Sequence, residues 1–95
     1  MTPSHLPELV LYTRDGCHLC EDTRAVVQGL LEERAAHGRR VAALHDRDIA
    51  ADPTLQRRFG STIPVLELNG HVLELATSPA RIRRFLDDAL EGSLA

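Results

Sequence analysis

The sequence has no lysine, no tryptophan and few aromatic residues, and each shortage removes a class of function. All eleven basic residues are arginines, which excludes Schiff-base chemistry because that chemistry needs a deprotonatable amine. A phosphate-binding loop is excluded as well, because that motif needs a lysine. One tyrosine and two phenylalanines are too few for a surface on which nucleic-acid bases stack. Since the net charge is −3, we expect no nucleic-acid partner.

Long apolar runs are also missing. The longest strictly apolar stretches have four residues, as at 9–12, whereas a membrane-spanning helix needs about 20. No lysine or arginine precedes Arg14 and no apolar signal core follows, so no secretory signal is recognised. We therefore expect no membrane partner and a cytoplasmic location. The length of 95 residues predicts a single domain over 1–95, with an ordered core of about 8–90 and frayed ends.

The two cysteines, Cys17 and Cys20, form a single C-x-x-C motif. In a reducing cytosol a permanent structural disulfide is not expected, so the pair points to redox catalysis or metal binding. Structural zinc needs four ligands, and the five histidines show no H-x₃₋₅-H spacing that could complete a site. We predict no metal site and favour redox chemistry. A pair of buried, inert cysteines is the alternative.

The first half of the chain reads as a strand followed by a helix. An apolar, β-branched run predicts a buried strand over 8–13. From Cys17 onward the apolar spacing becomes helical, until Gly38 ends the helix and Arg34 supplies positive charge near its C-terminus. The expected buried stripe, with Thr23 in line, consists of Leu19, Val26, Val27, Leu30 and Leu31.

The second half contains the remaining elements. A second strand is expected within 39–49, with its apolar part at 41–44. Asp52-Pro53 predicts the start of a short helix that buries Leu55 and Phe59 before Gly60. Asn69-Gly70 is typical of a type I′ turn and predicts a hairpin of 64–68 and 71–75. Ser78-Pro79 opens a last helix, whose apolar face is Ile82, Phe85, Leu86, Ala89 and Leu90.

The predicted order is therefore β-α-β-α-β-β-α. A strand, a crossover helix and a second strand imply two parallel strands joined by a right-handed connection. The hairpin adds antiparallel strands to this sheet. The fold class is α/β: a thioredoxin-like sandwich in which a four-stranded mixed sheet is flanked by helices.

The position of the cysteines at a helix start explains why they could be reactive. Unpaired N–H groups and the helix dipole stabilise a thiolate at Cys17, and such sites lower a cysteine pKa from about 8.5 to roughly 3.5–7.5. Cys20 lies one turn further on the same face, where it can attack a mixed disulfide on Cys17. Arg14 is either a cation that favours the thiolate or a solvated turn residue. His18 could tune the site when protonated, or it is simply an exposed first-turn residue.

Two stretches carry a family resemblance. Residues 11–21, LYTRDGCHLCE, resemble the active-site segment of glutaredoxins, and are most similar to small bacterial glutaredoxin-like proteins with a His-Leu pair between the cysteines. Segments within 48–66 match a second motif, which ends in FGSTIPVL. With the hairpin and last helix, the resemblance extends over nearly all of 8–90.

The resemblance implies roles for individual residues. Cys17 matches the nucleophile and Cys20 the resolving thiol, while Arg14 stands where glutaredoxins commonly have a lysine. It also identifies a substrate-binding loop, whose proline is cis and faces the dithiol and whose preceding residue pairs its backbone with a bound peptide or glutathione. The residues of this loop are Thr62, Ile63 and Pro64.

One departure from the family bears on the electron donor. Glutaredoxins hold the γ-glutamyl end of glutathione with a Gly-Gly pair and an acidic residue, and Leu75-Ala76 stands there instead. We expect both side chains to occupy that surface, so that glutathione is at most a weak co-substrate and no other cofactor is required. A reducing protein dithiol is then the expected electron donor.

These features support three hypotheses for the function. The leading one is a monomeric thiol–disulfide oxidoreductase of glutaredoxin-like type that acts on protein or small-molecule disulfides. A second is a non-catalytic thioredoxin-like module that binds partners or senses redox state. A third is an iron–sulfur carrier in which Cys17 and glutathione hold a cluster between two protomers, and the altered glutathione site speaks against it.

Overall fold

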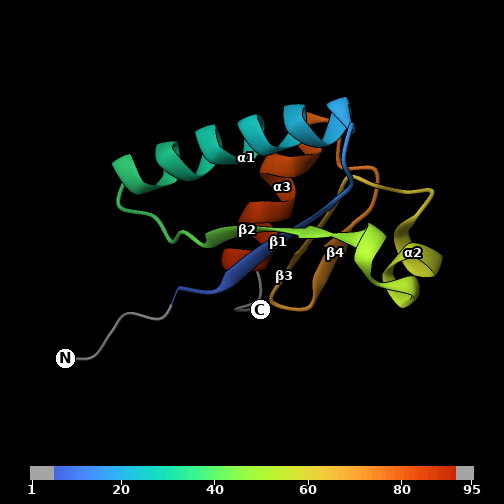
Figure 1. Ribbon diagram of the computed structural model, residues 1–95. Helices are drawn as coiled ribbons and strands as arrows, with labels where there is room; N and C mark the ends of the chain where they lie inside the picture. The colour runs from blue at the N-terminus through green and yellow to red at the C-terminus, as the bar shows by residue number, and fades with distance from the viewer. Residues whose placement is uncertain (1–5, 92–95) are drawn as a thin grey trace.

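The computed structural model describes residues 6–91, and this part of the chain contains three α-helices and a four-stranded sheet (Figure 1). The elements in chain order are β1 (Glu8–Thr13), α1 (His18–Ala36), β2 (Ala43–Asp48), a 3-10 turn (Ile49–Ala51), α2 (Pro53–Phe59), β3 (Val65–Leu68), β4 (His71–Leu73) and α3 (Pro79–Leu90). The predicted order β-α-β-α-β-β-α is confirmed. The fraying expected at 1–5 and 92–95 lies outside the described residues.

The sheet has the strand order β2-β1-β3-β4. β1 pairs with β2 in parallel and with β3 in antiparallel orientation, and β3 and β4 form an antiparallel hairpin. Leu11 at the centre of β1 lies opposite Asp46 on one side and Leu66 on the other. This is the mixed sheet and thioredoxin-like fold that the sequence predicts.

β2 begins later than its apolar residues suggest. The apolar part was expected at 41–44, whereas the strand runs from Ala43 to Asp48 and its last four residues are exposed. β2 is an edge strand, so its polar side chains can face water while its backbone still pairs with β1. Backbone pairing rather than hydrophobicity therefore sets its extent.

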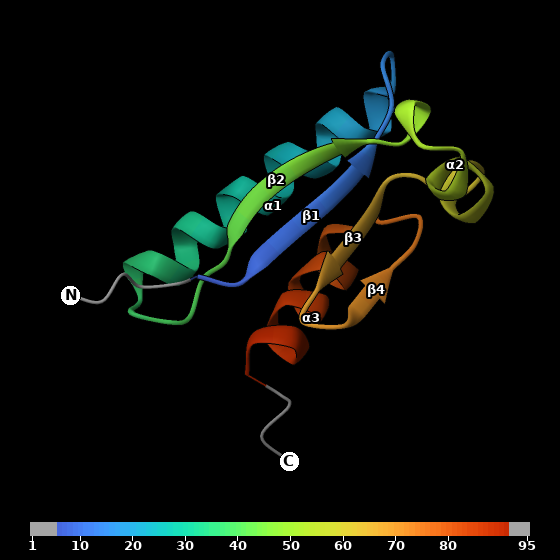
Figure 2. The ribbon, with the colours of Figure 1, turned by 60° about the horizontal axis from the view of Figure 1, so that its bottom comes forward.

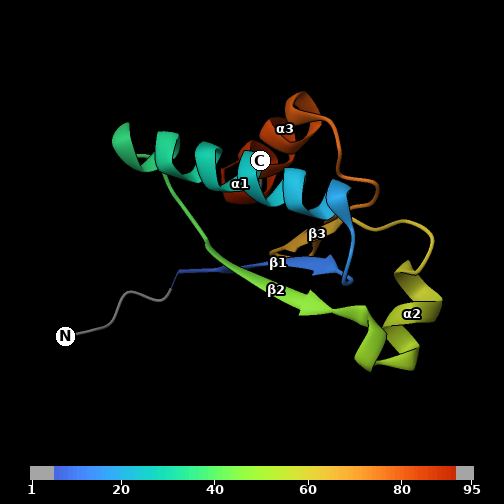
Figure 3. The ribbon, with the colours of Figure 1, turned by 45° about the horizontal axis from the view of Figure 1, so that its top comes forward.

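The helices cover the two faces of the sheet unequally. α1 and α3 lie across one face, and α2 lies beyond one end of the sheet (Figures 1 and 2). Figure 3 shows α1 and α3 crossing each other over the sheet. No helix within residues 6–91 is long and apolar enough to cross a membrane.

Two hydrophobic clusters follow from the alternation of side chains along each strand. The larger cluster, under α1 and α3, contains Leu9 and Leu11 of β1 with Leu66 and Leu68 of β3. All five apolar residues predicted for the last helix are buried against it. In α1 the prediction was wrong for Leu19, which is 53% exposed. The buried face of α1 is formed by Cys20, Thr23, Val27 and Arg34, and Leu19 lies at the edge of that face.

The smaller cluster lies on the opposite face and includes Leu55 and Phe59 of α2, as predicted. The rings of Tyr12 and Phe59 are 4.7 Å apart, and the Tyr12 hydroxyl donates a hydrogen bond of 2.5 Å to Oε1 of Glu67. Burial, followed by the hydrogen bond and negative charge of Glu67, raises the pKa of Tyr12 above its usual 10.0.

The helix caps and the hairpin turn predicted from the sequence are confirmed by the structure. The Asp52 carboxylate accepts hydrogen bonds from the N–H groups of Thr54 and Leu55, at 2.9 and 3.3 Å, and caps α2. Ser78 caps α3 in the same way. Asn69 and Gly70 both have positive φ, 51° and 83°, as a type I′ hairpin turn requires.

Arg34 has a larger role than the helix-end charge expected for it. Its side chain is 6% exposed and donates to the Arg40 carbonyl and to the carboxylates of Asp87 and Glu91, over 2.6 to 2.8 Å. Arg39 also bonds Glu91, and the hydrogen bond from Arg39 together with the charge of Arg34 lowers the pKa of the Glu91 carboxyl. This network joins the C-terminal ends of α1 and α3.

Candidate active site

The Cys17–Cys20 pair lies at the junction between β1 and α1. After Thr13 the chain turns through Gly16, whose φ of +78° lies in the left-handed region that glycine tolerates. The Cys17 N–H donates to the Arg14 carbonyl at 3.2 Å and closes this turn. Cys17 is thereby placed as the N-cap residue of α1.

The two cysteines are joined by a disulfide bond and differ in accessibility. Their Cα atoms are 5.2 Å apart, and the Cys20 N–H donates to Sγ of Cys17 at 3.1 Å. Cys17 is half-buried, whereas Cys20 is completely buried. A donor aimed at Sγ favours negative charge on that sulfur after reduction. The arrangement therefore allows thiol chemistry at Cys17 with Cys20 as its internal partner.

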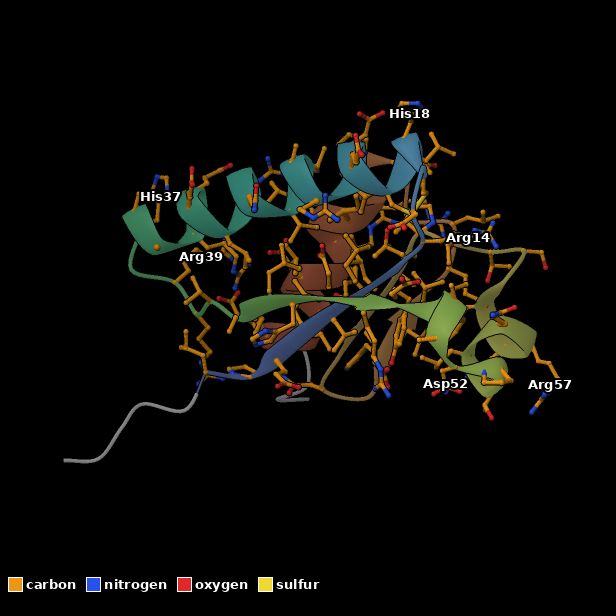
Figure 4. All side chains as sticks on the ribbon, in the orientation of Figure 1. Arg14, His18, His37, Arg39, Asp52 and Arg57 are labelled. Carbon is orange, nitrogen blue, oxygen red and sulfur yellow. A yellow bond between two sulfur atoms is a disulfide. The ribbon has the colours of Figure 1, made fainter. Side chains whose placement is uncertain are left out.

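Arg14 and His18 flank the motif and are both exposed. Figure 4 shows them at the end of the molecule where α1 begins, opposite the end where His37 and Arg39 lie. Arg14 lines a groove beside Cys17, whereas His18 is not among the residues that line it. Arg14 is therefore the better placed of the two to meet a bound group.

The groove beside Cys17 has a volume of about 350 Å³ and carries more acid than base. Its charged residues are Arg14, Asp15, Glu21, Arg24, Asp46 and Asp48. Arg24 is paired with Asp46 through two hydrogen bonds, of 2.6 and 3.2 Å. With four carboxylates against two guanidinium groups the formal charge is −2, so the groove attracts cations more than anions.

The loop before β3 is the one that the family resemblance predicts to bind substrate. The Ile63–Pro64 peptide bond is cis, as predicted. The carbonyls on either side of Ile63 are occupied: Thr62 accepts from the Leu75 N–H and Pro64 from the Ala76 N–H, both at 2.8 Å. Within residues 6–91, the N–H and carbonyl of Ile63 itself take part in no backbone hydrogen bond of this loop.

Leu75 and Ala76 differ from expectation in one respect. Leu75 is 50% exposed and occupies the surface as predicted, but Ala76 is completely buried. The expectation that both side chains cover the surface was therefore wrong. Ala76 points inward because its N–H bonds Pro64 and its carbonyl accepts from the buried Thr23 hydroxyl at 2.5 Å. The chain turns at Leu75, which has a left-handed φ of 51°.

One contribution to the site was missed from the sequence. Thr23 was read as part of the apolar stripe, although a hydroxyl within such a stripe signals a buried hydrogen-bond partner. Asp46 and Asp48, in the second half of β2, also line the groove. Among the described residues, no three His, Cys, Asp or Glu side chains are grouped so that they could hold a metal ion.

Comparisons with known proteins agree with this geometry. A family model described as “Glutaredoxin-like domain (DUF836)” matches residues 8–90. The crystal structure of protein XcR50 from X. campestris is 32% identical with a TM-score of 0.67, and the match covers 85% of this chain and 97% of that one. Protein Ne2328 from Nitrosomonas europaea is 27% identical, with a TM-score of 0.60 and coverage of 98% and 95%. Thioredoxin 1 from Thermosipho africanus, 13% identical with a TM-score of 0.61 and coverage of 93% and 99%, shares the fold. No curated protein matches the chain.

Proposed function

This chain belongs to the family of glutaredoxin-like domains, and from that premise we propose that it is a thiol–disulfide oxidoreductase. The observation that carries the proposal is the asymmetry of the cysteine pair. The half-buried Cys17 accepts a hydrogen bond from the Cys20 N–H at the start of α1, while Cys20 is completely buried behind it. Such asymmetry suits a nucleophile and a resolving thiol.

The proposed reaction has two thiol–disulfide exchanges. In the reduced protein, the Cys17 thiolate attacks one sulfur of a substrate disulfide, forms a mixed disulfide and releases the other sulfur as a thiolate. Cys20 then loses its proton and attacks Sγ of Cys17, which re-forms the internal disulfide and releases the second substrate thiolate. Both leaving thiolates take up a proton, so two protein thiols are oxidised while one disulfide becomes two thiols.

Substrate binding is proposed at the cis-proline loop. An extended segment on either side of the substrate cysteine pairs its backbone with the N–H and carbonyl of Ile63, with Thr62 and Pro64 fixing the loop. Leu19 and Leu75, respectively 53% and 50% exposed, offer apolar contact to a protein partner near the cysteines. Arg14 supplies a cation beside Cys17.

We propose a protein dithiol rather than glutathione as the electron donor. The exposed Leu75 side chain stands where the family places glycine, and it hinders the close approach of the γ-glutamyl backbone. Glutathione at pH 7 carries a net negative charge, and the groove beside Cys17 is itself negative by formal count. Glutathione is therefore proposed as a weak co-substrate, and a cytoplasmic location fits a dithiol that must be re-reduced.

The decisive experiment compares two reducing systems on the same peptide disulfide. Thioredoxin with its reductase and glutathione with its reductase are each coupled to NADPH oxidation, using the wild-type chain, Cys17→Ser and Cys20→Ser. We expect turnover with the thioredoxin system, none with Cys17→Ser, and a trapped mixed disulfide with Cys20→Ser. A chain that binds the peptide but supports no turnover with either system would instead be a partner-binding module.

A further inference from the structure

A continuous chain of hydrogen bonds joins the helix that carries the cysteines to the loop that carries Pro64. The Thr23 hydroxyl donates to the Ala76 carbonyl at 2.5 Å, and the Ala76 N–H donates to the Pro64 carbonyl at 2.8 Å. Thr23 is 2% exposed and lies three residues after Cys20 in α1. A displacement of Ala76 would therefore move Pro64 as well.

The segment around Ala76 holds the substrate loop at two points. Besides the bond from Ala76 to Pro64, the Leu75 N–H donates to the Thr62 carbonyl at 2.8 Å. The two anchored carbonyls flank Ile63, the residue proposed to pair with a substrate. The position of Ile63 relative to the cysteines thus depends on where residues 75 and 76 sit.

That position depends in turn on Thr23. Among the side-chain hydrogen bonds within residues 6–91, the one from Thr23 to Ala76 is the one that connects α1 with segment 62–76. Leu75 has a φ of 51°, a conformation that is sterically unfavourable for a residue with a Cβ. A turn of this kind relaxes toward other conformations unless its neighbours hold it.

We infer that Thr23 is a positioning residue, which fixes the substrate-binding backbone of Ile63 at a set distance from the Cys17–Cys20 pair. The inference rests on the proposed oxidoreductase function and adds a residue to it that touches neither substrate nor sulfur. Without the hydroxyl, the buried Ala76 carbonyl has lost its partner. Segment 75–76 then shifts and carries Thr62 and Pro64 with it.

The expected effect falls on substrate positioning and spares the reactivity of the cysteine. A shift of about 1 Å in a bound substrate can slow a reaction about 100-fold. For Thr23→Val we expect kcat/KM toward a peptide disulfide to fall at least about tenfold. Alkylation of Cys17 by iodoacetamide does not use the Ile63 loop, so its pH profile should stay as in the wild-type chain.

The experiment compares Thr23→Val with Thr23→Ser, which keeps the hydroxyl, and with Thr54→Val, the same exchange at an exposed threonine of α2. The probe is an oxidised peptide homodimer joined through its single cysteine. Rates are measured at a temperature where circular dichroism shows each variant to be folded, and Thr23→Ala replaces the valine variant if the latter does not fold.

Loss of peptide turnover in Thr23→Val, with near wild-type rates in the other two variants and an unchanged alkylation profile, supports the positioning role. Wild-type turnover in a folded Thr23→Val protein overturns it. So does an alkylation profile that shifts together with turnover, because the residue would then act on the sulfur itself. An inactive wild-type chain overturns the proposed function, and the positioning role with it.

Discussion

Replacing Arg34 with methionine tests whether the contact between α1 and α3 depends on a buried guanidinium. Methionine keeps most of the apolar stem and removes the three hydrogen bonds to the Arg40 carbonyl, Asp87 and Glu91. Arg34 is 6% exposed, whereas the Asp87 and Glu91 side chains are 42% and 34% exposed. The carboxylates can therefore regain water when the guanidinium is gone.

The magnitude follows from this difference in exposure. Removing one partner of a fully buried ion pair costs about 3–5 kcal/mol, and an exposed pair contributes about 0–1 kcal/mol. Since Arg34 is buried and its partners are not, we expect a loss of about 2–3 kcal/mol in the free energy of unfolding. For a domain of this length, that lowers Tm by roughly 10–20 °C.

Arg83→Met is the matched control. Arg83 pairs with Glu33 at 3.3 Å, but their side chains are 55% and 47% exposed. We expect the free energy of unfolding to change by at most about 0.5 kcal/mol in that variant. Urea denaturation of both variants at low salt measures the difference. If Arg34→Met proved as stable as Arg83→Met, the reading of Arg34 as a buried cross-link would be wrong.

Three further predictions concern the cysteines, the single tyrosine and the glutathione surface. In the reduced protein, iodoacetamide at pH 6 should label Cys17 in preference to Cys20, because Cys17 is accessible and accepts the Cys20 N–H; preferential labelling of Cys20 would reverse the assigned roles. Since the pKa of Tyr12 is raised, absorbance titration of the folded chain should give a midpoint above 10. The free energy of unfolding should fall as pH rises past 10, because the tyrosine of the unfolded state ionises first. Tyr12→Phe should remove that fall, and a midpoint at or below 10 would refute the burial argument. Leu75→Gly should raise the rate of reduction by glutathione several-fold with little change in Tm, because it opens the surface and suits a φ of 51°; an unchanged glutathione rate would show that Leu75 is not the obstacle.

Much of the fold was determined by short-range signals in the sequence. The caps Asp52 and Ser78, the Asn69-Gly70 turn and the apolar face of α3 each act over a few residues, so they could be read without knowing the rest of the chain. The Cys17–Cys20 motif and its place at a helix start belong to the same class. Apolar spacing together with these caps and turns predicted the order of the elements and the active-site helix.

The tertiary structure decided the contacts between residues that lie far apart in the chain. Thr23 meets Ala76 across 53 positions and Arg34 meets Asp87 across the same separation, and neither partner can be recognised from local pattern. Leu19 appears apolar and helical in the sequence, yet its exposure depends on which face of α1 packs against the rest of the molecule. Burial and hydrogen-bond partnership are properties of the assembled layers, because they depend on which surfaces meet rather than on which residues follow one another.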